Sequence, residues 1–181
     1  MLGFGLPMRL IGQNTLQRKN KTTIMQTEKE QRFKDLVHRN RDMLWHVCRD
    51  YRLSAAWTVD DAFQEVLCSL WRDIGQYKGA SSERTWVYRV AINTMNSLKR
   101  KKSNQPPAEP PASGIEAYKP SDLRDLEQLI ENLGEPDATI LRASIDGFDY
   151  AEIAEITKLS VGAVGMRLTR AKERIKKIYQ S

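Results

Sequence analysis

The chain has 181 residues, of which 40% are hydrophobic, enough for one medium-sized domain or two small ones. No apolar run approaches the roughly 20 residues that a membrane-spanning helix needs, so membrane insertion is not expected. The net charge of +6 favours an acidic partner, and it is unevenly spread. Ser121 to Glu155 holds ten acids and two basic residues, whereas Arg167 to Lys177 holds six basic residues and one acid.

Proline marks a joint in the chain, because five of the seven prolines lie between Pro106 and Pro120. Proline without apolar periodicity is typical of an extended linker. We therefore predict an all-α chain of two small helical domains, residues 28–102 and 121–181, joined by a flexible linker at 103–120. Residues 1–27 are predicted to be a disordered extension or the product of a non-native start, since Met25 begins a stretch that resembles a natural start.

The N-terminal domain is predicted to contain three main helices. Apolar residues at helical spacing indicate a first helix from about Glu28 to Arg52. Thr58 is a suitable N-cap for a second helix, whose first turn would carry acidic residues where the helix dipole favours them. Ser82 is expected to cap a third, after a loop bracketed by Gly75 and Gly79.

The third helix has two distinct faces when it is wound at about 100° per residue. The core side gathers Val87, Val90, Ala91, Thr94 and Leu98. The other side gathers Trp86, Arg89, Asn93, Asn96 and Arg100. An aromatic ring, two arginines and two amides suit single-stranded nucleic acid. A half-buried tryptophan beside solvated polar residues explains the same spacing, and the spacing alone leaves both alternatives open.

The C-terminal domain carries the pattern of a helix-turn-helix. Asp149 and Glu152 form a predicted capping box for one helix, and Ser160 is the expected cap of the next. That last helix is predicted to bury one side, made of Val161, Val164, Leu168, Ala171, Ile175 and Ile178. Near the start of this helix, Gly162, Ala163 and Gly165 have a small side chain or none, which would let the backbone approach DNA. Its basic residues would contact phosphates.

Other chemistry is not expected. The two cysteines, Cys48 and Cys68, are predicted to be buried and reduced in a cytoplasmic protein. With His38 and His46 they lack the spacing of a metal site. The sequence offers no acid pair, nucleophile with a base, or phosphate-binding glycine loop, so we predict no cofactor, no metal, no catalytic residue and no enzymatic activity.

At this point a resemblance is evident. The segments DDAFQEVLCSLWRDIGQY and ERTWVYRVAINTMNSLKRKK resemble the core-binding and promoter-melting region of bacterial RNA polymerase sigma factors. The segment IAEITKLSVGAVGMRLTRAKERIKK resembles the family's C-terminal helix-turn-helix. Two domains joined directly by a linker are typical of the extracytoplasmic-function, or ECF, type, and the resemblance covers about residues 28–178.

The resemblance implies a function in transcription initiation. Residues 28–102 would be sigma region 2 and residues 121–181 sigma region 4. Its implied partners are core RNA polymerase, through the clamp of the largest subunit and the flap, promoter DNA, and an anti-sigma factor. The residues implied for docking on core polymerase are Asp60, Asp61, Gln64 and Glu65. Those implied for the melted minus-ten strand are Trp86, Tyr88, Arg89, Asn93 and Arg100. Those implied for the minus-thirty-five element are Ser160, Val161, Gly162, Ala163, Gly165, Met166, Arg167, Thr169, Arg170 and Arg174.

One departure from the family pattern concerns base reading. The family often has a basic or hydroxyl residue where this chain has Gly165 and Met166, which weakens any reading of guanine by arginine. Two other functions remain open. The chain could be a helix-turn-helix regulator that acts without polymerase, although residues 28–102 lack the strand–helix alternation of a ligand or phosphoacceptor domain. It could also bind polymerase without promoter activity.

Overall fold

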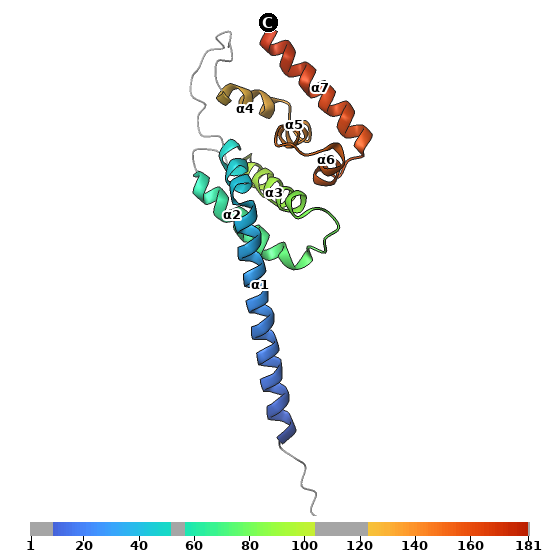
Figure 1. The fold of residues 1–181 in the computed structure, drawn as a ribbon. Helices are drawn as coiled ribbons and strands as arrows, with labels where there is room; N and C mark the ends of the chain where they lie inside the picture. The colour runs from blue at the N-terminus through green and yellow to red at the C-terminus, as the bar shows by residue number, and fades with distance from the viewer. Residues whose placement is uncertain (1–8, 52–56, 104–122, 181) are drawn as a thin grey trace, which may run out of the picture. The chain divides into compact units, whose positions relative to one another are not determined.

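The computed structural model describes residues 9–51, 57–103 and 123–180, where all regular structure is helical. Its elements are α1 (Arg9–Asp50), α2 (Val59–Asp73), the 3-10 turn η1 (Ile74–Gln76), α3 (Glu83–Ser103), α4 (Leu123–Asn132), α5 (Asp137–Ile145), α6 (Tyr150–Thr157) and α7 (Val161–Gln180) (Figure 1). The all-α prediction is confirmed. The predicted linker falls almost wholly outside the described residues.

The chain divides at Arg39 into two compact units. The first contains the N-terminal part of α1, which begins at Arg9 rather than near Glu28 as apolar spacing predicted. The sequence from 13 to 50 holds neither glycine nor proline, so no strong helix breaker interrupts this stretch. Apolar spacing located only the part of α1 with a buried face, because it reports burial rather than helix formation. The proposal of a non-native start stays a prediction.

The second unit, residues 40–181, contains a pair of packed helices, α2 and α3. The buried face of α2 consists of Ala62, Val66 and Leu70. On α3, the predicted core residues Val87, Ala91 and Leu98 are at most 2% exposed, Val90 is also buried, and Thr94 is half-buried.

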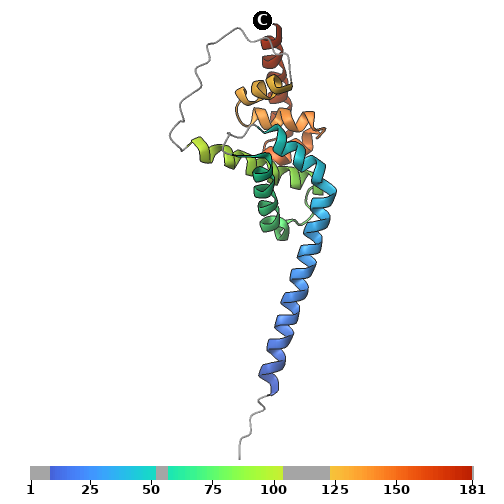
Figure 2. The ribbon, with the colours of Figure 1, turned by 90° about the vertical axis from the view of Figure 1, so that its left-hand side faces the viewer.

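Helices α4 to α7 form the C-terminal helical group of the same unit, in which α5 and α6 both pack against α7 (Figure 2). Lys158 ends α6 with φ of 61°, a left-handed conformation that turns the chain sharply into α7. The core contains Ile140, Ile153 and Leu168. Two residues predicted for the buried side of α7 are instead exposed, Val161 by 50% and Ile178 by 42%, because both lie near the ends of the helix.

The two cysteines lie in different environments. Cys48 is buried, as predicted, and burial raises the pKa of its thiol to about 12. The prediction that Cys68 is also buried is wrong, since this residue is exposed on α2. The apolar positions around it in the sequence belong to the neighbouring buried face.

This difference predicts selective alkylation of the native protein. Because the thiolate is the reactive form, Cys48 should remain unmodified by a maleimide at pH 8 while Cys68 reacts. Peptide mass spectrometry measures both sites, and modification in denaturant supplies the control in which both react. Equal reaction of the two cysteines in the native protein would contradict the burial of Cys48.

Helix α6 also packs on α3, so the two predicted domains are in contact within the second unit. Among the described helices, none combines the length and apolar character that crossing a membrane requires.

Candidate nucleic-acid interface

The outward face of α2 carries the residues predicted to dock on core polymerase. Thr58 caps the helix: its side chain accepts from the backbone N–H of Asp61, and the Asp61 carboxylate accepts from the Thr58 backbone N–H at 3.0 Å and hydroxyl at 2.7 Å. These hydrogen bonds hold the pKa of Asp61 below its usual value. Asp60 and Gln64 are exposed and Glu65 is half-buried. The face is thus polar and accessible, and its docking role stays a prediction.

The predicted minus-ten residues of α3 differ in accessibility. Arg89 is half-buried, and Asn93 and Arg100 are exposed. Trp86 is only 6% exposed, and its ring lies 5.1 Å from that of Tyr77 in the preceding loop. The Tyr77 hydroxyl donates to the Ser81 backbone carbonyl at 2.9 Å, which folds this loop back on itself.

An open hollow lies between this loop and α3. Its volume is about 340 Å³, and its lining includes Tyr77, Lys78, Ser81, Trp86 and Arg89 from the loop and α3, together with Glu155 and Lys158 from α6. An aromatic ring beside cationic side chains suits an unstacked base and its phosphate. The structure therefore brings the predicted loop together with Trp86 and Arg89.

Tyr88 has a different environment. It is fully buried, its ring lies 4.4 Å from Phe148, and its hydroxyl donates to Asp146 Oδ2 at 2.6 Å. Burial, and secondarily the negative charge of Asp146, raise the pKa of Tyr88 well above its usual value. In this arrangement the side chain has no exposed surface to offer DNA, and its predicted contact with DNA stays a prediction.

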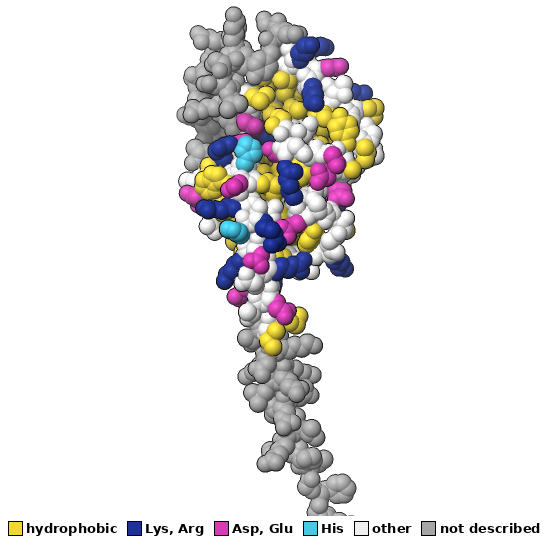
Figure 3. All heavy atoms as spheres, in the orientation of Figure 1, with side chains coloured by type: hydrophobic (Ala, Val, Ile, Leu, Met, Phe, Trp, Pro, Cys, Tyr) yellow, Lys and Arg dark blue, Asp and Glu magenta, His cyan; other side chains and the backbone are white. Residues whose placement is uncertain are grey.

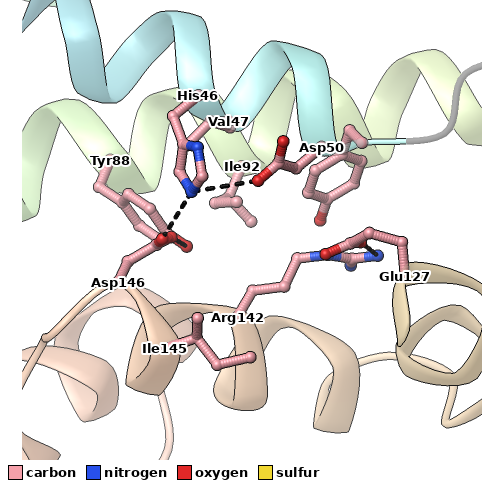
Figure 4. A pocket seen from close by; sticks show the side chains of 10 residues that line it. His46, Val47, Asp50, Tyr88, Ile92, Glu127, Arg142, Ile145 and Asp146 are labelled. Carbon is pink, nitrogen blue, oxygen red and sulfur yellow. Dashed lines mark hydrogen bonds and ion pairs between the residues drawn. The ribbon is translucent and has the colours of Figure 1, made fainter. Parts of the chain in front are cut away.

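Further contacts continue the packing of α3 against the C-terminal group. Arg84 Nη2 donates to the Asp146 carbonyl at 2.6 Å, and the Arg84 guanidinium lies 4.2 Å from the centre of the Phe148 ring. Thr85 donates to Glu152 at 2.8 Å. His46 Nε2 lies 3.3 Å from Asp146 Oδ1 and 3.1 Å from Asp50 Oδ2 (Figure 4).

The buried side chain of Arg142 lies beside these residues (Figure 4). The Arg142 side chain of α5 is 6% exposed and donates through Nε and Nη2 to Glu127 Oε2 at 3.2 and 3.1 Å. Its guanidinium lies 4.4 Å from the centre of the Tyr51 ring. Burial raises the pKa of Glu127, although Arg142 acts in the opposite direction. Neither Arg142 nor Asp146 was identified from the sequence, because their partners lie 15 to 100 residues away.

The predicted recognition helix α7 begins at the expected cap, since the Ala163 N–H donates to Ser160 Oγ at 3.2 Å. Val164 and Leu168 face the core. The accessible residues of the predicted set are Ser160, Val161, Gly162, Met166, Thr169, Arg170 and Arg174, while Ala163, Gly165 and Arg167 are half-buried. The Thr169 hydroxyl donates to the Gly165 carbonyl at 3.0 Å. Arg167 donates to Asp137 at 2.7 Å, so its guanidinium already has an anionic partner.

Comparison with known families matches both halves of the chain. Residues 36–105 match sigma-70 region 2, and residues 123–175 match sigma-70 region 4. The RNA polymerase sigma-H factor of Pseudomonas aeruginosa is 30% identical over 144 residues, which is 69% of this chain and 75% of that protein. The ECF RNA polymerase sigma-E factor of Escherichia coli K12 is 33% identical over 136 residues, which is 65% of this chain and 71% of that protein.

Two solved structures share the fold. One is the sigma factor RpoE of Bartonella quintana in complex with the anti-sigma factor NepR, with a TM-score of 0.63 and 21% identity over 82% of this chain and 96% of that one. The other is CnrH in complex with the cytosolic domain of CnrY, with a TM-score of 0.62 and 20% identity over 83% of this chain and 89% of that one. Since regions 2 and 4 follow each other here in the family's order, and the matching relatives include ECF sigma-E factors, this chain belongs to the ECF group of RNA polymerase sigma factors.

Proposed function

We propose that this chain, as a sigma factor for promoter recognition and transcription initiation, divides the two promoter elements between its two regions. The observation that carries this proposal is the presence of regions 2 and 4, in that order, in one chain. A regulator that acts without polymerase would have no need of region 2. The chain would therefore act in the cytoplasm, with core polymerase, and without a catalytic residue of its own.

Docking on core polymerase is assigned to the outward face of α2, with Asp60, Asp61, Gln64 and Glu65. The geometry of α2 supports this assignment, because Thr58 and Asp61 fix the start of the helix and the face opposite these residues is buried. Carboxylates on an exposed helix favour a basic partner surface and speed association through charge complementarity.

Minus-ten recognition is assigned to the hollow between α3 and its preceding loop. Trp86 and Arg89 line it, and Asn93 lies one helical turn beyond Arg89 on α3, with an exposed amide. A base that leaves the duplex could stack against the half-buried Tyr77 ring, which lies on Trp86, while arginine neutralises its phosphate. Melting would then be driven by binding of the unstacked strand, without nucleotide hydrolysis.

Minus-thirty-five recognition is assigned to α7, whose capped N-terminus offers free backbone N–H groups to phosphate. An anti-sigma factor is a further proposed partner. Its support is that the Bartonella quintana relative was solved in complex with one.

Run-off transcription tests the proposal. Core polymerase is incubated with a library of promoter fragments, with and without this protein, and the transcripts are sequenced. Defined transcripts that depend on the protein establish the function and give both promoter elements. Binding to core polymerase without any transcript would favour the regulatory alternative, and absence of binding would overturn the assignment of α2.

The position of Cys68 provides a second test of the docking face. At about 100° per residue, Asp61, Gln64, Glu65 and Cys68 fall within an arc of about 100° on α2. We therefore expect core polymerase to slow maleimide modification of Cys68 strongly. Promoter DNA without polymerase is the control and should leave the rate unchanged. An unchanged rate with saturating core polymerase would place the docking surface elsewhere.

A further inference from the structure

The exposed side of α7 near its N-terminus is apolar, whereas a helix that reads DNA usually carries polar side chains there. When α7 is wound at about 100° per residue, Val161, Gly162, Gly165, Met166 and Thr169 fall within an arc of about 140°, which begins at Val161 beside the core residue Leu168 and ends at Met166. Between Val161 and Thr169 no charged residue lies within this arc, whereas Lys172, Glu173 and Lys176 fall within it further along the helix. Met166 is 60% exposed and Val161 is 50% exposed.

A third apolar side chain reaches this surface from the preceding helix. Tyr150, in the first turn of α6, is 48% exposed, and its Cε2 lies 3.5 Å from the position of a Cβ built on Gly165. The ring therefore lies against the bare backbone of α7. We call Tyr150, Val161 and Met166 the apolar front. Figure 3 shows hydrophobic side chains at the surface beside α6 and the start of α7.

The nearby cations do not change the character of this surface. Arg167 is paired with Asp137 at 2.7 Å and lies about 100° further around the helix than Met166. Arg170 is exposed but lies about 40° beyond the Met166 edge of the arc. Beyond it, Lys172, Arg174, Lys176 and Lys177 are all accessible, with Glu173 as the single acid among them. The apolar front thus continues into a basic surface, a charge pattern that fits DNA rather than an apolar protein partner.

The chemical groups on each base edge determine which bases the apolar front can recognise. In the major groove, the C5 methyl group of thymine is the apolar group that a base edge presents, whereas guanine presents two acceptors. An apolar side chain against guanine would desolvate those acceptors without replacing their hydrogen bonds, which is unfavourable. The flexible thioether side chain of methionine can adapt to a methyl group.

We propose that the apolar front reads thymine methyl groups in the upstream promoter element, with Met166 and Tyr150 as specificity-determining residues. Tyr150 contributes from the first helix of the helix-turn-helix, which would extend the reading surface beyond α7. This inference rests on the proposed function, because it concerns the duplex that α7 would contact.

The test replaces thymine by uracil, which pairs identically but lacks the methyl group. Promoter fragments recovered by run-off transcription are made with single uracil substitutions in the upstream element, and binding of the complete holoenzyme is measured. Each contacted methyl group removed should weaken binding by about three- to fivefold, as expected for burial of one such group. Met166→Ala and Tyr150→Ala should each abolish the penalty at a particular thymine while weakening binding to the thymine duplex.

Two controls separate base reading from other effects. Arg174→Ala, which removes a cation further along α7, should weaken binding to thymine and uracil duplexes by the same factor and reduce the salt dependence. Ile145→Ala removes an apolar side chain that is 58% exposed elsewhere in the C-terminal group, and should leave the thymine-to-uracil ratio unchanged. Circular dichroism of each variant confirms that its helices are intact.

Several outcomes would overturn the inference. The first is equal binding of thymine and uracil duplexes, and the second is a uracil penalty that both alanine variants retain. A third is an upstream element without thymine. Loss of transcription in Met166→Ala with an unchanged thymine-to-uracil ratio would indicate a protein contact instead. In all these cases promoter-specific transcripts persist with the unaltered protein, whereas their complete absence would refute the proposed function itself.

Discussion

Replacing Leu168 by alanine is expected to lower the free energy of unfolding by about 2–5 kcal/mol, the usual range for a buried leucine. Leu168 is 1% exposed on α7, and α5 and α6 pack against this helix. The loss combines the transfer of the side chain from water with the cavity that remains. Thermal and urea unfolding followed by circular dichroism measure the change.

The matched control for Leu168→Ala is Glu173→Ala on the same helix. Glu173 is exposed, so its replacement should change the free energy of unfolding by no more than about 0.5 kcal/mol. Comparable destabilisation by the two variants would show that α7 does not use the Leu168 side as its core face. Promoter binding should fall in Leu168→Ala, because a recognition helix needs a fixed position on its supporting helices.

Replacing Arg142 by methionine is expected to cost about 3–5 kcal/mol, because it leaves the Glu127 carboxylate partly buried without its partner. Arg142 also lies against the Tyr51 ring, and that contact would be lost. The companion change Glu127→Gln should recover part of the loss in the double variant, since it removes the unpaired charge. Urea unfolding of the single and double variants measures the coupling between the two residues.

The cost of Arg142→Met should depend on pH in a defined direction. Burial already raises the pKa of Glu127, and loss of the arginine would raise it further. A raised carboxyl pKa means that the folded state binds the proton more tightly than the unfolded state does. The associated stability is present below the unfolded pKa and is lost as the pH rises through the folded pKa. The deficit of the variant should therefore be larger at pH 7 than near pH 4. A deficit independent of pH would show that Glu127 is not the group affected.

Local interactions explain why much of the helical framework could be predicted. Thr58, Asp149 and Ser160 each accept a hydrogen bond from a backbone N–H three residues later. Such caps depend on a few consecutive residues. The prediction was less successful at the N-terminal start of α1 and at Val161 and Ile178, because helical spacing states which residues share a face but not where burial begins or ends along it.

The candidate site depended more on tertiary contacts. Trp86 and Arg89 were found from one face of α3, but the same winding could not show that Trp86 packs on Tyr77. The pairing of Arg167 with Asp137, 30 residues away in the sequence, was equally inaccessible. The predicted contact of Arg167 with the minus-thirty-five element stays a prediction. Tyr150 was missed because its sequence position marks it only as the start of α6.

The sequence by itself determined the all-α class, the caps of α2, α6 and α7, and the family, because these depend on short-range spacing and on motifs along the chain. Only the tertiary structure decided which side chains of these helices stay available. In the folded chain Tyr88 is buried against Phe148 and Asp146, Arg167 is paired with Asp137, and Tyr150 lies beside Gly165. The physical reason is that burial and pairing depend on partners 15 to 60 residues away, which helical periodicity does not encode.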